Sequence, residues 1–231
     1  VPEDADCIVV NTCSVREHAE QRAIGRLFDL SRHRNAVIAV CGCMAQRLGA
    51  SLFDLVPAVK IVAGTDSYAL LPGAIENAAG TGDRFSLLEM DPRVAYEPGP
   101  VKSKSAVSRY VSITRGCENF CSYCIVPYVR GPEVSRSPRS ILAELEELGP
   151  VREVTLLGQN VNSYRYEGLD FPGLLRQVLP ALRPPAWLRF LTSHPKDFSP
   201  RLIELLSEGP PLCRHVHLPV QHGADPVLAR M

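Results

Sequence analysis

The sequence lacks an excess of charge of either sign, and it lacks a long apolar run. Lysine plus arginine and aspartate plus glutamate both number 25, so the net charge is zero and any basic surface must be local. The longest apolar stretch, residues 36–45, is about half of what a membrane span needs. The first residues, VPEDAD, are acidic and have no apolar segment, so we expect no signal peptide. A composition of 45% hydrophobic and 22% charged residues excludes wholesale disorder.

The eight cysteines are too few for a disulfide scaffold, and they are clustered along the chain. Four lie early, three lie between residues 117 and 124, and Cys213 stands alone. Such clustering favours metal or redox chemistry over structural disulfides. The chain starts with Val1 and ends with Met231 just after the apparent start of a helix, so we expect segments to be missing at both ends.

Strand and helix patterns alternate in the first part of the chain. We predict strands at residues 6–12, 36–41 and 59–63, separated by helices at 14–34 and 45–56 and followed by a helix at 66–78. Ser14 and Glu17 resemble a capping box at the start of the first helix. This order predicts a parallel, Rossmann-like α/β domain over residues 1–80, and the Pro- and Gly-rich range 81–106 reads as a linker.

A second alternation fills residues 107–231. Strands are predicted to start near Tyr110, Glu153, Trp187 and His215, with helices between them. Ser137 and Ser199 each precede a proline, which is the pattern of a helix N-cap followed by a first-turn proline. Gly149 lies where a C-cap glycine would end a helix. A closed eight-unit barrel needs about 250 residues, so four units indicate a partial (β/α) barrel, truncated after about four strands.

Cys117, Cys121 and Cys124 form the sharpest motif, because three thiolates lie within eight residues directly after a predicted strand. One loop can wrap them around a four-iron cluster and leave one iron open for a small molecule. A structural zinc would need a fourth ligand that is not nearby, and three free buried thiols are a further alternative. The spacing differs from the C-x2-C-x2-C run of a bacterial ferredoxin, so an electron carrier fits weakly.

The C-x3-C-x2-C spacing, with Tyr123 before the last cysteine, resembles the radical S-adenosylmethionine (SAM) superfamily. The resemblance implies that Cys117, Cys121 and Cys124 hold a [4Fe–4S] cluster whose fourth iron binds SAM. It also implies reductive cleavage of SAM to methionine and a 5′-deoxyadenosyl radical, with Tyr123 near the cofactor.

Cys13 and Cys43 each lie just past a predicted strand, where an open parallel sheet binds ligands. Cys7 and Cys41 lie within strands and are expected to be buried and inert. Cys13 and Cys43 could equally be buried thiols by spacing alone. The strings NTCSVRE at 11–17 and CGCMAQ at 41–46, however, resemble the methylthiotransferases, a radical-SAM family with a second [4Fe–4S] cluster.

In that family three cysteines hold the second cluster, and Cys13 and Cys43 match two of them. We expect the third upstream of Val1, so the chain as it stands should bind this auxiliary cluster poorly. The resemblance covers essentially the whole chain. Its further strings are PYVRG at 127–131, SR at 135–136, LGQNVNSY at 157–164, TSHP at 192–195 and HLPVQ at 217–221.

The GQNVNSY string resembles the branch that modifies tRNA. It implies addition of a methylthio group to carbon 2 of N6-isopentenyladenosine at tRNA position 37. Alternatives are a sibling that acts on threonylcarbamoyladenosine in tRNA or on a ribosomal-protein aspartate, an iron–sulfur electron carrier, and a zinc-held RNA-binding module. The resemblance also implies a reductant protein such as flavodoxin or ferredoxin, a cytoplasmic monomer without a membrane partner, and a C-terminal TRAM domain that nothing here matches.

Gln159, Ser193 and Gln221 each follow a predicted strand at the mouth of the barrel, where polar groups could bind SAM. Loop residues that face water are the alternative. His215 and His217 lie two apart on a predicted strand, and a packed or hydrogen-bonded role is expected for them rather than metal binding.

Positive charge gathers around the central cysteines. Residues 102–139 hold two acidic residues, Glu118 and Glu133, and seven basic ones, which are Lys102, Lys104, Arg109, Arg115, Arg130, Arg136 and Arg139. This balance is compatible with RNA docking, and a solvated linker is the alternative.

Overall fold

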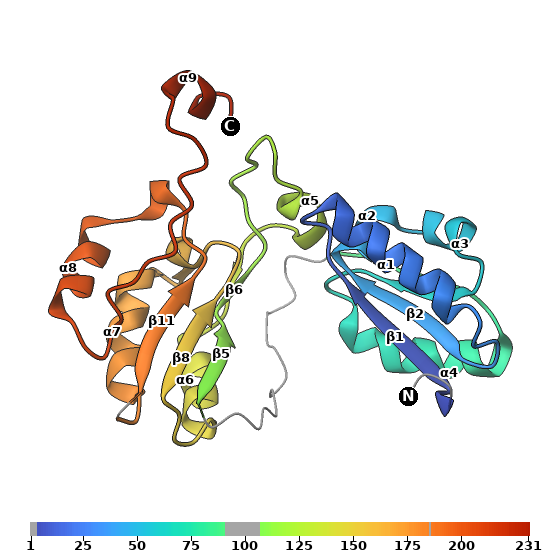
Figure 1. Ribbon diagram of the computed structural model, residues 1–231. Coiled ribbons are helices and arrows are strands. Elements are labelled where there is room, and N and C mark those ends of the chain that lie inside the picture. Colours follow the sequence, from blue (N-terminus) through green and yellow to red (C-terminus); the bar gives the residue numbers. More distant parts are fainter. Residues whose placement is uncertain (1–3, 91–106, 185) are drawn as a thin grey trace. The chain divides into compact units, whose positions relative to one another are not determined.

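The computed structural model of the chain describes residues 4–90, 107–184 and 186–231 (Figure 1). Contacts divide the chain into two units. The first unit consists of residues 1–91 together with 123–131, and the second of residues 92–122 together with 132–231. No helix in the described ranges has the length and apolar character to cross a membrane.

A four-stranded parallel sheet in the order β1-β2-β3-β4 forms the centre of the first unit. Its strands are β1 (Cys7–Thr12), β2 (Val37–Gly42), β3 (Val59–Ala63) and β4 (Phe85–Leu87). The helices of this unit are α1 (Glu17–Leu30), α2 (Cys43–Leu48), α3 (Ser51–Leu55), the 3-10 helix η2 (Tyr68–Leu70), α4 (Leu71–Thr81) and α5 (Val126–Arg130). The predicted parallel α/β architecture is therefore confirmed.

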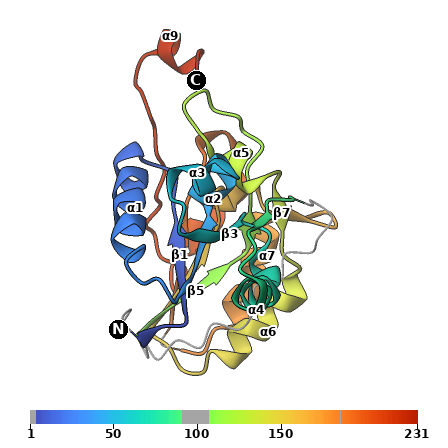
Figure 2. The same cartoon turned by 90° about the vertical axis from the view of Figure 1, so that its right-hand side faces the viewer.

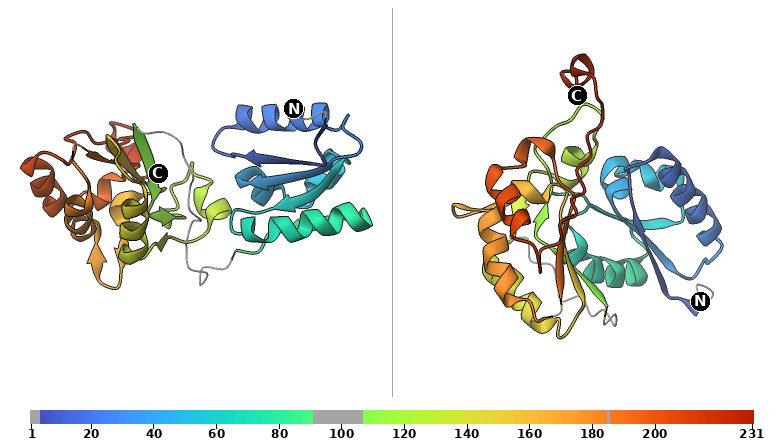
Figure 3. Two further views of the ribbon diagram at one scale, coloured as in Figure 1. Left: turned by 90° about the horizontal axis from the view of Figure 1, so that it is seen from below. Right: turned by 60° about the vertical axis from the view of Figure 1, so that its left-hand side comes forward.

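Helices cover both faces of this sheet, which explains why β2 is a continuous apolar run (Figure 3). Successive side chains of a strand point to opposite faces. Ile38 and Val40 pack with α1, α2 and α3, whereas Ala39 and Cys41 pack with α4. The whole of β2 is thereby withdrawn from water.

Three local predictions for the first unit are wrong. Arg16, not Ser14, is the N-cap of α1, and no side chain caps this helix. The predicted helix over 45–56 is interrupted at Gly49, whose φ of +55° breaks it into α2 and α3. Residues 85–87 form β4 inside the range predicted as a linker, because they pair with β3.

The second unit is built on a three-stranded parallel sheet in the order β11-β8-β5. The strands are β5 (Ser108–Ser112), β8 (Glu153–Leu157) and β11 (Trp187–Leu191), and the helices between and after them are α6 (Pro138–Glu147), α7 (Phe171–Ala181) and α8 (Pro200–Glu208). Figure 2 shows the unit from a second direction. Side chains of the sheet and these helices form one hydrophobic core. In it the rings of Phe171 and Phe190 pack edge to face, with their centroids 5.1 Å apart.

Shorter elements complete the second unit. They are the antiparallel pairs β6 (Thr114–Arg115) with β7 (Val134–Ser135) and β9 (Arg165–Tyr166) with β10 (Leu169–Asp170), the 3-10 helices η3 (Val161–Ser163) and η4 (Pro195–Asp197), and α9 (Asp225–Leu228).

The helix starts of the second unit follow the sequence prediction. Ser137 accepts a hydrogen bond from the Ser140 N–H, and Ser199 accepts one from the Leu202 N–H. Gly149 follows α6 with a φ of +68°.

The strand predicted near His215 is wrong. Residues 214–224, all of which the structure describes, form no strand, and the edge of β11 has only a single bridge from Leu188 to Leu212. The unit thus has three parallel strands in its sheet where four were predicted, within the expected β/α architecture.

Candidate functional site

The central cysteines lie on the loop between β6 and α5 (Val126–Arg130). Cys117 is buried, and Cys121 and Cys124 are half-buried. Within the described residues, no three His, Cys, Asp or Glu side chains gather closely enough to hold a metal ion. The donor set itself, three thiols on one short loop that form no disulfide, suits an iron–sulfur cluster. The ligand role of these thiols stays a prediction from their spacing.

His194 faces one of these cysteines. Its Nε2 lies 4.0 Å from the Cys121 Sγ, and its Nδ1 accepts a hydrogen bond of 3.2 Å from the Lys196 N–H. A neutral imidazole whose Nδ1 accepts carries its proton on Nε2, which is the nitrogen that faces the thiol. Sequence reasoning assigned no chemistry to His194, because a contact across 73 positions leaves no local signal.

The segment 160–163 clamps the loop that carries His194. The His194 N–H is 2.9 Å from the Asn162 Oδ1, and the Asn162 amide donates in return to the His194 carbonyl at 2.9 Å. The Asn160 amide donates to Asp197 at 2.7 Å. Asn160 and Asn162 are buried, and their hydrogen bonds hold the His194 loop in place. Part of the GQNVNSY string therefore has a structural role.

Three polar atoms are left without partners where the strands of the second sheet end. Thr114 Oγ1 follows β5, Gln159 Oε1 follows β8, and Ser193 Oγ follows β11; each is buried and has no hydrogen-bond partner among the described residues. A buried unpaired polar atom costs about 1–3 kcal/mol, so a polar ligand at this edge would be stabilising. A Cβ on Gly158 would lie 1.9 Å from Thr114 Oγ1, so the close approach at this position requires glycine.

The predicted positions of Gln159 and Ser193 after strands are therefore confirmed, while that of Gln221 is wrong. Gln221 is exposed, has a φ of +64° and follows no strand in the described part of the chain. His215 and His217 likewise lie outside any described strand and are exposed, so a packed role for them is wrong, and a hydrogen-bonded role stays a prediction.

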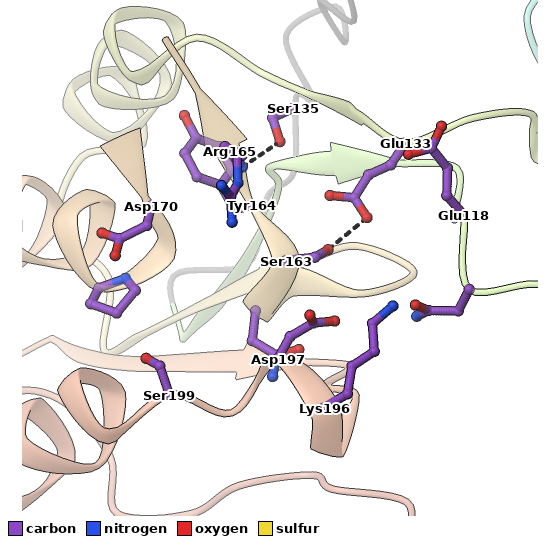
Figure 4. Close-up of a pocket in the computed structure, with 13 residues that line it drawn as sticks. Glu118, Glu133, Ser135, Ser163, Tyr164, Arg165, Asp170, Lys196, Asp197 and Ser199 are labelled. Atoms are coloured by element: carbon purple, nitrogen blue, oxygen red, sulfur yellow. Dashed lines mark hydrogen bonds between the residues drawn. The ribbon is translucent and has the colours of Figure 1, made fainter. Parts of the chain in front are cut away.

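A polar cavity of about 510 Å³ opens in the second unit (Figure 4). Its lining includes Glu118 of the cysteine loop, Ser163 of η3, and Lys196 and Asp197 of η4. Burial foremost, and then the charges of Asp197 and Glu118, raise the pKa of Glu133, although a hydrogen bond from Ser163 at 2.6 Å and the charge of Lys196 oppose this shift. Sequence reasoning counted Glu133 only as a charge and did not place it in a cavity.

Cys13 and Cys43 follow adjacent strand ends in the first unit. Thr12 and Gly42 are partners in the parallel pairing of β1 with β2, and each is followed directly by one of these cysteines. The Thr12 hydroxyl donates to the Cys41 carbonyl at 2.6 Å. A Cβ on Gly42 would lie 2.4 Å from the backbone carbonyl oxygen of Thr12. This tight junction places Cys13, on the segment after β1, and Cys43, at the start of α2, at the same edge of the sheet.

The four early cysteines differ in environment. Cys13 is exposed and Cys43 is buried. Burial raises the pKa of the Cys7 and Cys41 thiols, which keeps them protonated at neutral pH and makes them poor metal ligands. Their places within β1 and β2 agree with the inert role expected for them, and Cys41 is buried as predicted, whereas Cys7 is half-buried.

The predicted basic surface loses part of its support. Arg136 is only 4% exposed and donates to the Ser112 carbonyl, to Ser140 and to Glu144, so it is a structural residue and its charge does not add to a basic surface. Arg130 donates to the Cys43 Sγ. Lys102 and Lys104 lie outside the described residues.

Two family models match separate parts of the chain. Residues 1–64 match a family described as "Uncharacterized protein family UPF0004", and residues 111–231 match the radical SAM superfamily. A curated protein of Desulfosudis oleivorans is 47% identical over 100% of this chain and 51% of its own length. One of Geobacter metallireducens is 46% identical over 99% of this chain and 54% of its own length.

Both relatives are named tRNA-2-methylthio-N(6)-dimethylallyladenosine synthase. The chain spans about half the length of the curated relatives it matches.

Proposed function

This chain belongs to the radical SAM superfamily, and from that premise we propose that it acts as a tRNA methylthiotransferase. The reaction would add a methylthio group to carbon 2 of N6-isopentenyladenosine at tRNA position 37. The observation that carries this proposal is the identity of 46–47% to synthases of this name along essentially the whole chain. Membership of the superfamily implies a [4Fe–4S] cluster and SAM.

In this proposal Cys117, Cys121 and Cys124 hold the [4Fe–4S] cluster. Three protein ligands leave one iron open for SAM. When bound, the cluster and SAM supply a 5′-deoxyadenosyl radical for hydrogen-atom removal. An adenine C–H bond has no useful acidity, so side-chain acid–base catalysis would not reach it.

The residues of the second unit would orient SAM. The unpartnered oxygens of Thr114, Gln159 and Ser193 are available to its polar groups at one edge of the sheet. Asn160 and Asn162 would keep the His194 loop in place through the hydrogen bonds described above. From the sequence motif Tyr123 would lie against SAM.

A second [4Fe–4S] cluster would provide the sulfur. Cys13 and Cys43 would each contribute a thiolate, together with a third thiolate from elsewhere. Their positions after the paired residues Thr12 and Gly42 support this assignment, because adjacent strand ends bring both residues to one edge of the sheet. The further partners in this proposal are tRNA and a reductant protein such as flavodoxin or ferredoxin, with the enzyme a cytoplasmic monomer.

Nucleoside mass spectrometry of tRNA tests the proposed reaction. The gene that encodes this chain is expressed in a host that lacks its own methylthiolating enzyme. We expect 2-methylthio-N6-isopentenyladenosine to appear and N6-isopentenyladenosine to fall. Unmodified N6-isopentenyladenosine, in cells whose purified protein carries iron, would contradict this substrate and favour a sibling methylthiotransferase.

A further inference from the structure

Arg130 connects the segment after the central cysteines with a thiol of the early part of the chain. Its Nε donates a hydrogen bond of 3.2 Å to the Cys43 Sγ across 87 positions of sequence. Both residues belong to the first unit, and Cys43 is only 5% exposed. A guanidinium beside a sulfur is a charged donor, and charge-assisted hydrogen bonds are roughly twice as strong as neutral ones.

Helix α5, which ends at Arg130, is fixed to the first unit by a second hydrogen bond. Thr65 follows β3, and its Oγ1 donates to the Val129 carbonyl at 2.9 Å. Both residues are buried, Val129 to 2% exposure, and α5 packs against α2, the helix that begins with Cys43. This hydrogen bond and packing hold α5 beside α2, and the contact of the Arg130 side chain with Cys43 adds to that attachment.

The surroundings of this contact are polar and charged. Burial foremost raises the pKa of Tyr68, and the charge of Arg130 opposes this shift. Tyr68, Arg130 and Cys43 therefore lie within electrostatic reach of one another. The guanidinium is the cation of this group, beside a sulfur that would be an anion when it binds iron.

We propose that Arg130 is a positioning residue for the Cys43 thiol, so that the thiol site of the first unit is incomplete without α5. The guanidinium holds the sulfur at the end of β2 and offsets its charge when it binds iron. This inference rests on the proposed role of Cys43 as a ligand of the second cluster. Partners of a metal ligand commonly change metal affinity about 10- to 100-fold when they are replaced.

A double-mutant cycle in the whole chain tests the contact without any metal. The variants are Cys43→Ala, Arg130→Met and the two together, and the readout is hydrogen exchange of residues 126–131. We expect each single change to speed exchange about two-fold or more, and the double variant to exchange no faster than the faster single variant. Arg130→Lys, which keeps a charged donor, should restore part of the protection.

Arg32→Met is the matched control, because Arg32 is an exposed arginine of the same unit whose ion pair with Asp29 is also exposed. We expect it to leave the exchange of residues 126–131 unchanged. Additive effects of Cys43→Ala and Arg130→Met on the exchange rate of residues 126–131 would overturn the proposal. An exchange rate that Arg130→Met leaves unchanged would also overturn it.

Iron retention tests the consequence for the second site. Cys117, Cys121 and Cys124 are changed to Ala, and the protein is reconstituted with ferrous iron and sulfide, so that only the site in the first unit can report. Arg130→Met should then lose iron to a chelator about ten-fold faster, with Arg130→Lys in between. Equal loss with and without Arg130 would overturn the proposal. Absence of iron before Arg130 is changed would agree with the poor binding expected without a third thiolate, and the double-mutant cycle would then decide on Arg130.

Discussion

Among single residues, Cys117 is the sharpest test of the central motif, since it is the most buried of its three thiols. Cys117→Ala leaves two thiolates, which do not hold a four-iron cluster with one open iron. We expect this change to abolish the formation of 5′-deoxyadenosine from SAM in anaerobic, reduced protein, as measured by mass spectrometry. Cys213→Ala, outside the motif, should keep it. Deoxyadenosine from the Cys117→Ala variant would refute the ligand assignment.

Arg136 shows how a charge counted in the sequence can belong to the core. Arg136→Met would leave Glu144, itself largely buried, without its partner. Breaking a buried ion pair in this way costs about 3–5 kcal/mol, so we expect the free energy of unfolding in urea to fall by about that amount. Arg176→Met, which breaks an exposed pair with Glu208, should cost less than about 1 kcal/mol. Equal losses in the two variants would contradict the structural role of Arg136.

Residue spacing predicted the cysteine motif and the polar residues after β8 and β11, because both signals are local. It could not predict that His194 faces Cys121, or that Glu133 lies in a cavity with Asp197. These contacts join segments that are distant in sequence, and the local sequence around His194 or Glu133 does not indicate which residue lies beside it. The same holds for Arg130 and Cys43.

At the scale of elements, the junction of β1 and β2 depends on one glycine. Gly42 has a φ of +95°, and a Cβ there would press on the backbone oxygen of Thr12. We expect Gly42→Ala to lower the free energy of unfolding by about 1–3 kcal/mol, because the clash falls on backbone that cannot rotate away. Thermal and urea unfolding measure the change.

Gly80→Ala is the control for this substitution. Gly80 lies in α4, and a Cβ there would meet nothing within 4 Å. Alanine favours a helix over glycine by about 0.5–1 kcal/mol, so this variant should be slightly more stable. Destabilisation of the same size at both positions would show that the strand junction is not the cause.

Elements were predictable where the apolar pattern was long and their partners were neighbours in sequence. Strands β1, β2 and β3 follow such runs, and Ser137 and Ser199 carry their helix caps in the local sequence. Strand β4 has only three residues and forms by pairing with β3, so the local sequence does not predict it. The strand prediction at residues 215–220 is wrong, because an alternating pattern alone does not provide a neighbouring strand for hydrogen bonding.

For the whole molecule, the division into units does not follow the order of the chain. A cut at the predicted linker would assign everything after residue 106 to one domain, yet residues 123–131 belong to the first unit. Reading along a sequence finds boundaries where composition changes. It does not find a short segment that leaves one unit to pack in another, because Thr65 and Val129 show their contact only in the fold.

Expression of residues 107–231 alone tests this division. Helix α5 has five residues, far below the length at which an isolated helix is stable, and without the first unit it loses the Thr65 hydrogen bond and the cover over Val129. We therefore expect residues 126–131 to exchange amide hydrogens much faster in the fragment than in the whole chain. Helix α7, whose buried side chains lie in the core of the second unit, should exchange at the same rate in both. Equal protection of α5 in the fragment and in the whole chain would assign α5 to the second unit, and Arg130 would then be held in place by something other than its contact with Cys43.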